Sequence, residues 1–236
     1  MQSSPSNTLS YKNDPQISQY EITPYKSSNK QITSMKLPNN TDLIPGKYEG
    51  GLKIWECSLD LIDFLPSIFA NLPGVDKATV LDLGCGHGFG GLYFALKGAN
   101  VVFQDFNPEV LEQITKSYII QIKEKYNVDL MNKCMFASGD WGNFTFNGKF
   151  DVIVSGDTLY NVDNYDKIYN ILKTYLDKNG RAYFATKKFY YGVGGGMNQF
   201  RAYIMEKGEF DITKVKEINT GMSNIRDILE LKWKTI

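Results

Sequence analysis

The sequence predicts an α/β fold built on a mostly parallel, seven-stranded sheet with helices on both faces. Three observations lead to this prediction. Short apolar runs alternate along the chain with segments of helical length, as expected for strand–helix–strand units. One run, Val80–Leu83, ends in a glycine-rich turn that leads into a helix. The last two runs, residues 211–217 and 225–233, follow each other without a helix between them, which predicts an antiparallel strand at the end of the chain.

Composition divides the chain into an arm and one domain. Five of the eight prolines fall at or before Pro45, among many Ser and Asn residues and without a sustained hydrophobic period. We therefore expect residues 1–41 to be a flexible arm and residues 42–236 to be a single domain. Lys and Arg total 26, as do Asp and Glu, so the formal net charge is zero. This balance gives no general basic field, and direct nucleic-acid binding is not expected.

The number of cysteines and histidines and the lengths of the apolar runs indicate which classes of protein are excluded. The three cysteines lack paired or metal-like spacing, and the single histidine, His87, argues against a zinc site, so no metal is expected. No apolar run approaches the length needed to span a membrane. Residues Met1–Pro5 lack the apolar core of a secretory signal. These features are typical of an intracellular protein.

The expected elements follow one another along the domain. Apolar side chains from Ile54 to Ile68 recur at helical spacing, and Pro66 is expected to kink or shorten this helix. A turn at Lys178–Gly180 precedes a strand, and the aromatic and glycine-rich loop 187–196 is expected to shape a substrate pocket. The other expected helices cover residues 89–97, 108–125, 165–176 and 197–207, and the other expected strands cover residues 100–105, 134–138, 150–155 and 181–186.

The glycine-rich turn is the first candidate site. Gly84, Gly86 and Gly88 allow the main chain to approach a ligand closely. The run from Gly86 to Gly91 also fits dinucleotide-binding spacing, but Asp82 before it favours a ligand with a cationic amino group over a pyrophosphate. The pattern Asp82-x-Gly84-x-Gly86-x-Gly88 resembles the first motif of the seven-strand, S-adenosylmethionine-dependent methyltransferases. That resemblance implies a Rossmann-like class I fold with S-adenosylmethionine as cofactor.

An acid at the end of the next strand is the candidate ribose ligand. Asp105 lies about twenty residues beyond the turn, where a carboxylate accepts hydrogen bonds from both ribose hydroxyls. Asn107 precedes Pro108 and suits a helix cap, and we also count it among the cofactor-binding candidates together with Ser155.

Three more residues are candidates for the cofactor pocket. Asp140 is expected to accept a hydrogen bond from an adenine amino group, and Trp141 to cover the ring. Their alternative roles are turn formation and a buried anchor. Trp55 serves either in the core or in the wall of the pocket.

The catalytic candidates follow strand 150–155. Chemistry in open α/β sheets takes place at the carboxyl ends of the strands, and Asp157, Tyr160 and Asn161 are the polar residues expected there.

Four segments together resemble one family, the protein-histidine methyltransferases called methyltransferase-like protein 18. They are Tyr48–Cys57, Val80–Gly86, Phe103–Asn107 and Phe189–Gly196, in the order found in that family. The resemblance implies methyl transfer to the pros nitrogen of a histidine in a large-subunit ribosomal protein. We also expect a monomer that acts in the cytoplasm, the nucleus or both. We hypothesise that Asp157 or Asn161, aided by Tyr160, accepts a hydrogen bond from the other ring N–H.

The sequence departs from the family at His87, where a serine is usual, at Asp157, where a glutamate is expected, and in a shorter connection between the second and third strands.

Two alternative functions stay open. One is a lysine methyltransferase of the same fold, which has to deprotonate an ammonium of pKa about 10.4. The other is a binding or chaperone module that retains the cofactor.

Overall fold

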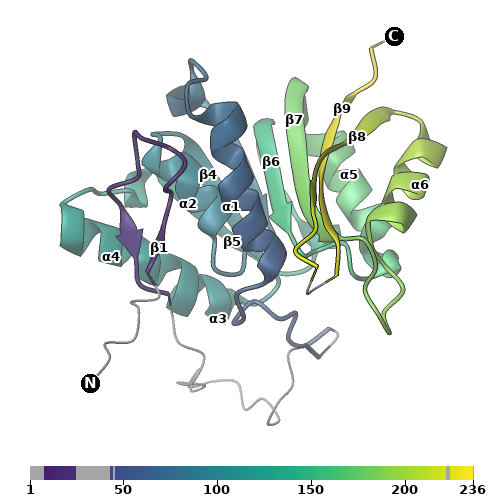
Figure 1. Cartoon of the computed structure of the whole chain (residues 1–236), viewed down its shortest axis with the longest axis horizontal. Coiled ribbons are helices and arrows are strands. Elements are labelled where there is room, and N and C mark those ends of the chain that lie inside the picture. The colour runs from purple at the N-terminus through teal and green to yellow at the C-terminus, as the bar shows by residue number, and fades with distance from the viewer. Residues whose placement is uncertain (1–7, 25–42, 45, 222–223, 236) are drawn as a thin grey trace.

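The computed structural model describes residues 8–24, 43–44, 46–221 and 224–235. Its centre is a seven-stranded sheet in the order β5-β4-β3-β6-β7-β9-β8 (Figure 1). Strand β9 is antiparallel to both of its neighbours, and the other pairs are parallel, which confirms the predicted sheet. The strands are β3 (Thr79–Leu83), β4 (Asn100–Asp105), β5 (Cys134–Ser138), β6 (Phe150–Gly156), β7 (Leu176–Lys187), β8 (Phe210–Ile218) and β9 (Arg226–Trp233).

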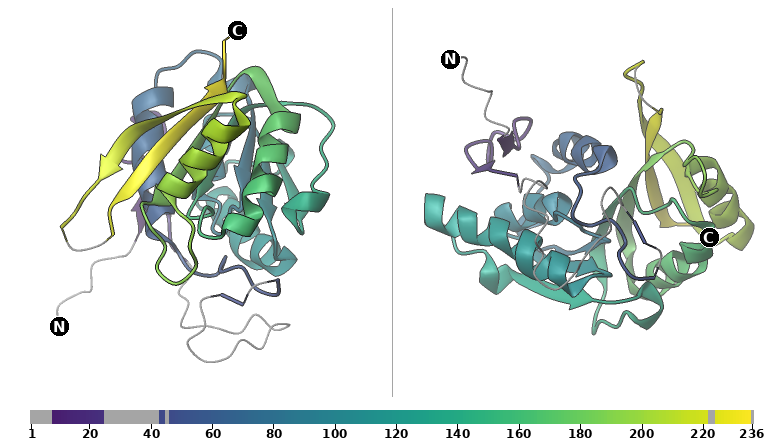
Figure 2. Two further views of the ribbon diagram at one scale, coloured as in Figure 1. Left: turned by 90° about the vertical axis from the view of Figure 1, so that its right-hand side faces the viewer. Right: turned by 90° about the horizontal axis from the view of Figure 1, so that it is seen from below.

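Helices cover both faces of the sheet (Figure 2). Alternate strand residues face opposite cores: Val80 packs into one and Leu81 into the other. The central strands are therefore apolar on both faces, as is usual for buried parallel strands. The first core contains side chains of α1 (Glu56–Phe69), α2 (Phe89–Leu96) and α4 (Lys116–Tyr126), and the second contains side chains of α5 (Tyr165–Tyr175) and α6 (Met197–Lys207).

Most predicted elements are present, and several boundaries differ. Helix α1 continues past Pro66 to Phe69, so the proline does not shorten it. The predicted helix 108–125 consists of α3 (Pro108–Val110), a π-helical stretch (Leu111–Thr115) and α4. Short 3-10 turns occur at Val75–Lys77, Met131–Lys133, Trp141–Asn143 and Val162–Asn164.

The start of β7 was predicted wrongly. We expected a turn at Lys178–Gly180 and a strand from Arg181, whereas β7 begins at Leu176. Leu176 pairs with Phe150, and an irregularity in register separates this pair from the next one, Val152 with Arg181. Residues Lys178–Gly180, which have turn-forming side chains, therefore belong to the irregular first part of β7. At the other end of the sheet, the antiparallel strand β9 lies between β7 and β8, so that β8 forms the edge.

Part of the predicted flexible arm, residues 8–24, is packed against the domain. Residues 8–24 include β1 (Leu9–Ser10) and β2 (Glu21–Ile22), which pair with each other. Tyr11, Ile17 and Ile22 are buried in the first core. The Tyr11 hydroxyl donates to the Phe89 carbonyl at 2.9 Å, at the start of α2. The rest of the predicted arm, residues 1–7 and 25–41, lies outside the described residues.

The carboxyl ends of the parallel strands meet at one edge of the sheet, the lower edge in Figure 1. The glycine turn follows β3, Asp105 ends β4, Asp140 follows β5 and Asp157 follows β6. Candidate residues that are spread along the sequence from Gly84 to Asp157 are therefore brought together by the topology at one edge. In the part of the chain that the structure describes, no helix is both long and apolar enough to cross a bilayer.

Candidate functional site

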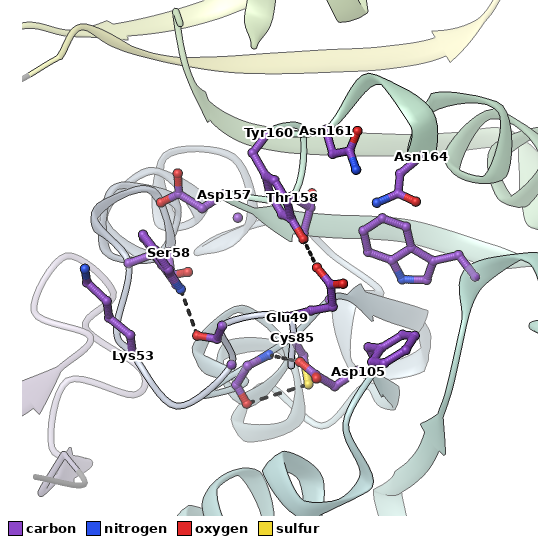
Figure 3. A pocket seen from close by; sticks show the side chains of 18 of the residues that line it. Glu49, Lys53, Ser58, Cys85, Asp105, Asp157, Thr158, Tyr160, Asn161 and Asn164 are labelled. Carbon is purple, nitrogen blue, oxygen red and sulfur yellow. Dashed lines mark hydrogen bonds between the residues drawn. The ribbon is translucent and has the colours of Figure 1, made fainter. Parts of the chain in front are cut away.

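A cavity of about 280 Å³ opens at this edge of the sheet (Figure 3). The glycine turn and the loops after β4, β5 and β6 form one side of it, and residues 46–58 form the other. Six of the predicted cofactor-binding residues line the cavity: Trp55, Gly84, Gly86, Asp105, Asp140 and Trp141. All three catalytic candidates line it as well: Asp157, Tyr160 and Asn161.

The glycine turn is shaped by close backbone packing. Gly84 has φ +63°, and a Cβ there would lie 2.6 Å from Cγ2 of Thr158 and 3.2 Å from the indole of Trp141. A side chain at this position would therefore both strain the backbone and collide with two walls of the cavity. The requirement for glycine predicted at this point of the turn is thus explained by geometry.

Asp105 faces the cavity as the sequence predicts. Its Oδ2 accepts from the Gly86 N–H at 2.9 Å and its Oδ1 from the Asn107 N–H at 3.0 Å. Burial raises the pKa of this carboxyl to about 6, and the nearby Glu49 carboxylate adds to the rise, while the backbone N–H groups lower it. A carboxylate that borders the glycine turn is suited to hold a ribose diol.

The raised pKa of Asp105 predicts a pH dependence of cofactor binding. Ribose hydroxyls donate to the ionised carboxylate, so affinity is full above pH 6 and falls as the group becomes protonated below it. The Kd for S-adenosylmethionine, measured by calorimetry, is expected to be about tenfold higher at pH 5 than at pH 7.5. The Asp105→Asn variant should lose this dependence, and a wild-type Kd that does not change with pH would contradict the assignment.

Asp82 lies behind the turn and does not line the cavity, in contrast to the prediction. Its Oδ2 accepts from the Gly91 N–H at 2.7 Å, within the first turn of α2. A carboxylate at this place satisfies an otherwise unpaired N–H and interacts favourably with the helix dipole. Burial raises its pKa to about 7. Asp82 therefore supports the cofactor turn by anchoring α2, and its expected contact with a cationic amino group stays a prediction.

Gln104 is a site residue that sequence analysis missed. Its Oε1 accepts from the Gly84 N–H at 3.2 Å and from the Trp141 indole at 2.6 Å, and its amide donates to the Gly139 carbonyl at 2.8 Å. One side chain thus ties together the glycine turn, the indole and the end of β5. The available signal was a glutamine in an otherwise apolar strand, since a polar group buried there needs partners.

Trp141 and Asp140 border the end of the cavity where adenine was expected. The Asp140 carboxylate accepts from the Gly142 N–H at 2.7 Å and pairs with Lys167 at 2.7 Å. The Lys167 ammonium holds the pKa of Asp140 below its usual range. The turn role weighed for Asp140 is therefore present, and its contact with an adenine amino group stays a prediction.

Three other predicted cofactor ligands support the cavity from outside its lining. Gly88 lies outside the lining residues. Asn107 donates to the Lys47 carbonyl at 2.9 Å and accepts from the Glu49 N–H at 3.1 Å, so it fixes the loop opposite the turn. Ser155 is fully buried and donates to the Leu83 carbonyl at 2.7 Å. Asn107 and Ser155 are hydrogen-bonded to the protein and do not line the cavity, so their predicted role as direct ligands stays a prediction.

A second cavity of about 410 Å³ adjoins the first. The predicted loop 187–196 supplies much of its wall, including Phe189, Tyr190 and Tyr191. Glu49, Trp55, Asp157 and Tyr160 line both cavities, and Trp55 is held by a hydrogen bond of 3.0 Å from its indole to the Gly50 carbonyl. These four residues mark the junction between the cavities. Glu49 was not predicted, although it lies within a segment that carries the family resemblance.

Asp157 is held in place on both carboxylate oxygens. Its Oδ2 accepts from the Cys57 N–H at 2.9 Å and its Oδ1 from the Tyr190 hydroxyl at 2.6 Å. Cys57 lies in the first turn of α1, where the N-cap residue Trp55 offers no side-chain cap. Asp157 therefore caps α1 from another part of the chain. Its backbone has φ +59°, which Asp tolerates better than most residues.

Asn161 lines only the first cavity. Its side chain accepts from the Asp163 N–H at 3.0 Å, and its backbone pairs with Gly194. It therefore joins the segment after β6 to loop 187–196. Because Asn161 does not line the second cavity, it is a weaker candidate than Tyr160 for contact with a methyl acceptor.

His87, the departure in the glycine turn, is a structural residue. Its Nδ1 lies 2.6 Å from the Tyr118 hydroxyl and its Nε2 lies 3.1 Å from the Leu52 carbonyl. Burial lowers its pKa to about 4. The neutral ring connects α4 to residues 46–58, where a serine side chain is too short to span both partners.

Taken as a donor set, the first cavity fits the expected cofactor. A carboxylate borders the turn, an indole forms a wall, and the turn exposes backbone at Gly84 and Gly86. These features suit a diol, an aromatic base and a polar tail, respectively.

Residues 75–228 match a family model described as a methyltransferase domain. The chain is 41% identical over 202 residues to the histidine protein methyltransferase 1 homolog of Dictyostelium discoideum, and the matched region covers 84% of this chain and 63% of that protein. It is 33% identical over 240 residues to the Rattus norvegicus homolog, and this match covers 89% of this chain and 64% of that protein. The chain thus spans 63–64% of the length of these relatives.

Among solved structures, the magnesium protoporphyrin IX methyltransferase of Synechocystis PCC 6803 with bound SAM is similar in fold. Its TM-score is 0.58 at 19% identity, over 75% of this chain and 79% of that chain. At this identity the likeness concerns the fold alone, and it agrees with the predicted Rossmann-like architecture.

Proposed function

The chain belongs to the methyltransferase-domain family, and on that premise we propose that it transfers a methyl group from S-adenosylmethionine to a histidine ring nitrogen of a protein substrate. The observation that carries this proposal is the pair of adjoining cavities. One has the donor set for the cofactor, and the other has room for an acceptor side chain. The relatives named histidine protein methyltransferase support histidine as the acceptor.

The finer proposal names the substrate as a large-subunit ribosomal protein and the reacting atom as the pros nitrogen. The segments Tyr48–Cys57 and Phe189–Gly196 support it, since they carry the family resemblance and line the junction and the second cavity. We also propose that the protein acts as a monomer, in the cytoplasm, the nucleus or both.

The reaction does not require a covalent bond between the protein and the methyl group. When bound, S-adenosylmethionine supplies a methyl group on a positively charged sulfonium. A neutral imidazole, with a reference pKa of about 6.5, has a lone pair that attacks the methyl carbon directly. The residues at the junction hold the ring in line with the methyl group and keep water out, and such positioning is worth up to roughly 7–11 kcal/mol.

Labelling tests this proposal. The protein is incubated with S-adenosylmethionine that carries a radioactive methyl group and with ribosomal protein extract, and the modified residue is located by mass spectrometry. We expect the label on a histidine of a large-subunit protein, as the pros isomer. A label on lysine would favour the alternative acceptor. Cofactor binding without transfer to any protein would favour a binding or chaperone module.

A further inference from the structure

We propose that Glu49 accepts a hydrogen bond from the non-reacting ring nitrogen of the acceptor histidine and thereby selects the nitrogen that is methylated. This inference deepens the proposed function and rests on it. It replaces the sequence-based hypothesis in which Asp157 or Asn161 has this role.

Position is the first argument. A methyl group passes from one cavity to the other only at their junction, which is lined by Glu49, Trp55, Asp157 and Tyr160. Two of these residues carry a carboxylate. Figure 3 shows Glu49 and Tyr160 pointing toward each other across the cavity, with Asp157 set apart from the pair.

Burial, and not the number of hydrogen bonds, separates the two carboxylates. Asp157 is 7% exposed, and its oxygens accept from the Cys57 N–H in the first turn of α1 and from the partly buried hydroxyl of Tyr190. Turning Asp157 toward a substrate would leave the buried N–H of α1 without an acceptor. Asp157 is therefore a positioning residue that holds loop 187–196 against α1.

Glu49 also accepts two hydrogen bonds, but its side chain is only partly buried, and its backbone is fixed. The Glu49 N–H donates to Asn107 at 3.1 Å, which fixes the residue relative to the end of β4. One carboxylate oxygen accepts from the Gly46 N–H at 2.7 Å, and the other accepts from the Tyr160 hydroxyl. A carboxylate has about four acceptor sites on its two oxygens. Two therefore stay available toward the cavities, and Tyr160 is able to donate to Glu49 while an imidazole does the same.

The chemistry requires such an acceptor. A neutral imidazole has one N–H and one lone pair, so a carboxylate bound to the N–H leaves the other nitrogen to react. That nitrogen forms the new N–C bond as the C–S bond breaks, with the electron pair staying on sulfur. The positive charge passes to the ring, where the Glu49 carboxylate stabilises it, and the N–H proton is lost to bulk water once the product has left the site. With the pros nitrogen reacting, Glu49 binds the N–H of the other nitrogen, Nε2.

Product analysis of the Glu49→Ala and Glu49→Gln variants tests the assignment. With ribosomal protein extract as substrate, we expect kcat to fall at least tenfold for both variants. The products should become a mixture of the two methylhistidine isomers, because either tautomer then reacts. The Kd for S-adenosylmethionine should stay within about threefold of wild type. A role of Glu49 in folding alone would lower the amount of active protein without changing the isomer ratio.

Two controls make the result specific. Glu112→Gln removes an exposed carboxylate far along the chain that pairs with Lys116, and it should leave rate and isomer ratio unchanged. Tyr160→Phe keeps the Glu49 carboxylate, so its product should stay a single isomer even if the rate falls.

Three outcomes would overturn the assignment. Unchanged rate and isomer purity in Glu49→Ala would remove Glu49 from the reaction. A tenfold or larger rise in the Kd for S-adenosylmethionine, with one isomer still formed, would place Glu49 on the cofactor's amino group. A wild-type label on lysine would overturn the proposed function as well, so the two failures are distinguished by the wild-type product.

Discussion

Replacing Asp105 with alanine is expected to raise the Kd for S-adenosylmethionine roughly 100-fold. Asp105 faces the cavity beside the glycine turn, and two charge-assisted hydrogen bonds to a diol contribute about 1.5–3 kcal/mol each. A loss of about 3 kcal/mol corresponds to a factor of roughly 100 in affinity. Isothermal calorimetry at pH 8, where the carboxyl is ionised, measures this change.

The control for Asp105→Ala is Glu112→Ala, which removes an exposed carboxylate and should not alter the Kd. Circular dichroism confirms that the variant is folded, because the substitution also removes the acceptor for the Gly86 and Asn107 N–H groups. A Kd within threefold of wild type would show that the ribose is held elsewhere.

Replacing Asp14 with alanine is expected to lower the free energy of unfolding by about 3 kcal/mol. Asp14 has no exposed side chain and pairs with Lys97, which is 5% exposed, at 3.1 Å. It also accepts from the Tyr93 hydroxyl at 2.9 Å. The substitution leaves the buried Lys97 ammonium with only the neutral oxygens of Gln16 and Ala70, and the loss of the opposite charge is costly. For a chain of this size the melting temperature should fall by roughly 6–12 °C.

A double variant separates the ion pair from packing. Asp14→Ala combined with Lys97→Met removes both charges, and we expect it to recover a good part of the lost stability, since replacing a whole buried pair is much less costly than breaking it. Thermal unfolding of the four proteins completes the cycle. A change below about 0.5 kcal/mol for Asp14→Ala would mean that residues 8–24 add nothing to the fold.

The sheet and most helices were predictable because their hydrophobic periods are local. Val80–Leu83 and Phe150–Gly156 are apolar on both faces, and the glycines that follow β3 mark the turn. The start of β7 was not predictable, since Lys178–Gly180 has turn chemistry that only the pairing with β6 overrides. Residues 8–24 were missed for a similar reason: their few apolar side chains are buried by helices far along the chain.

The candidate site was predictable in its cofactor half and less so at its junction. Asp105 and Trp141 follow strand ends, where the fold class alone places ligands. Asp82 and Asp157 were recognised as important, but their bonds to helix N-termini depend on contacts between distant segments. Glu49 was missed, although Trp55 nearby was considered for the pocket wall, because its contact with Tyr160 joins segments that lie far apart in the sequence.

Helix α2 connects the cofactor turn to residues 8–24. Its first turn binds Asp82 and Tyr11. Tyr93 within the helix and Lys97 directly after it bind Asp14. Any free energy that couples occupation of the turn to docking of residues 8–24 must act equally in both directions. If a ligand at the turn stabilises the docking of residues 8–24 against proteolysis by some factor, removing residues 8–24 should weaken the affinity for that ligand by the same factor.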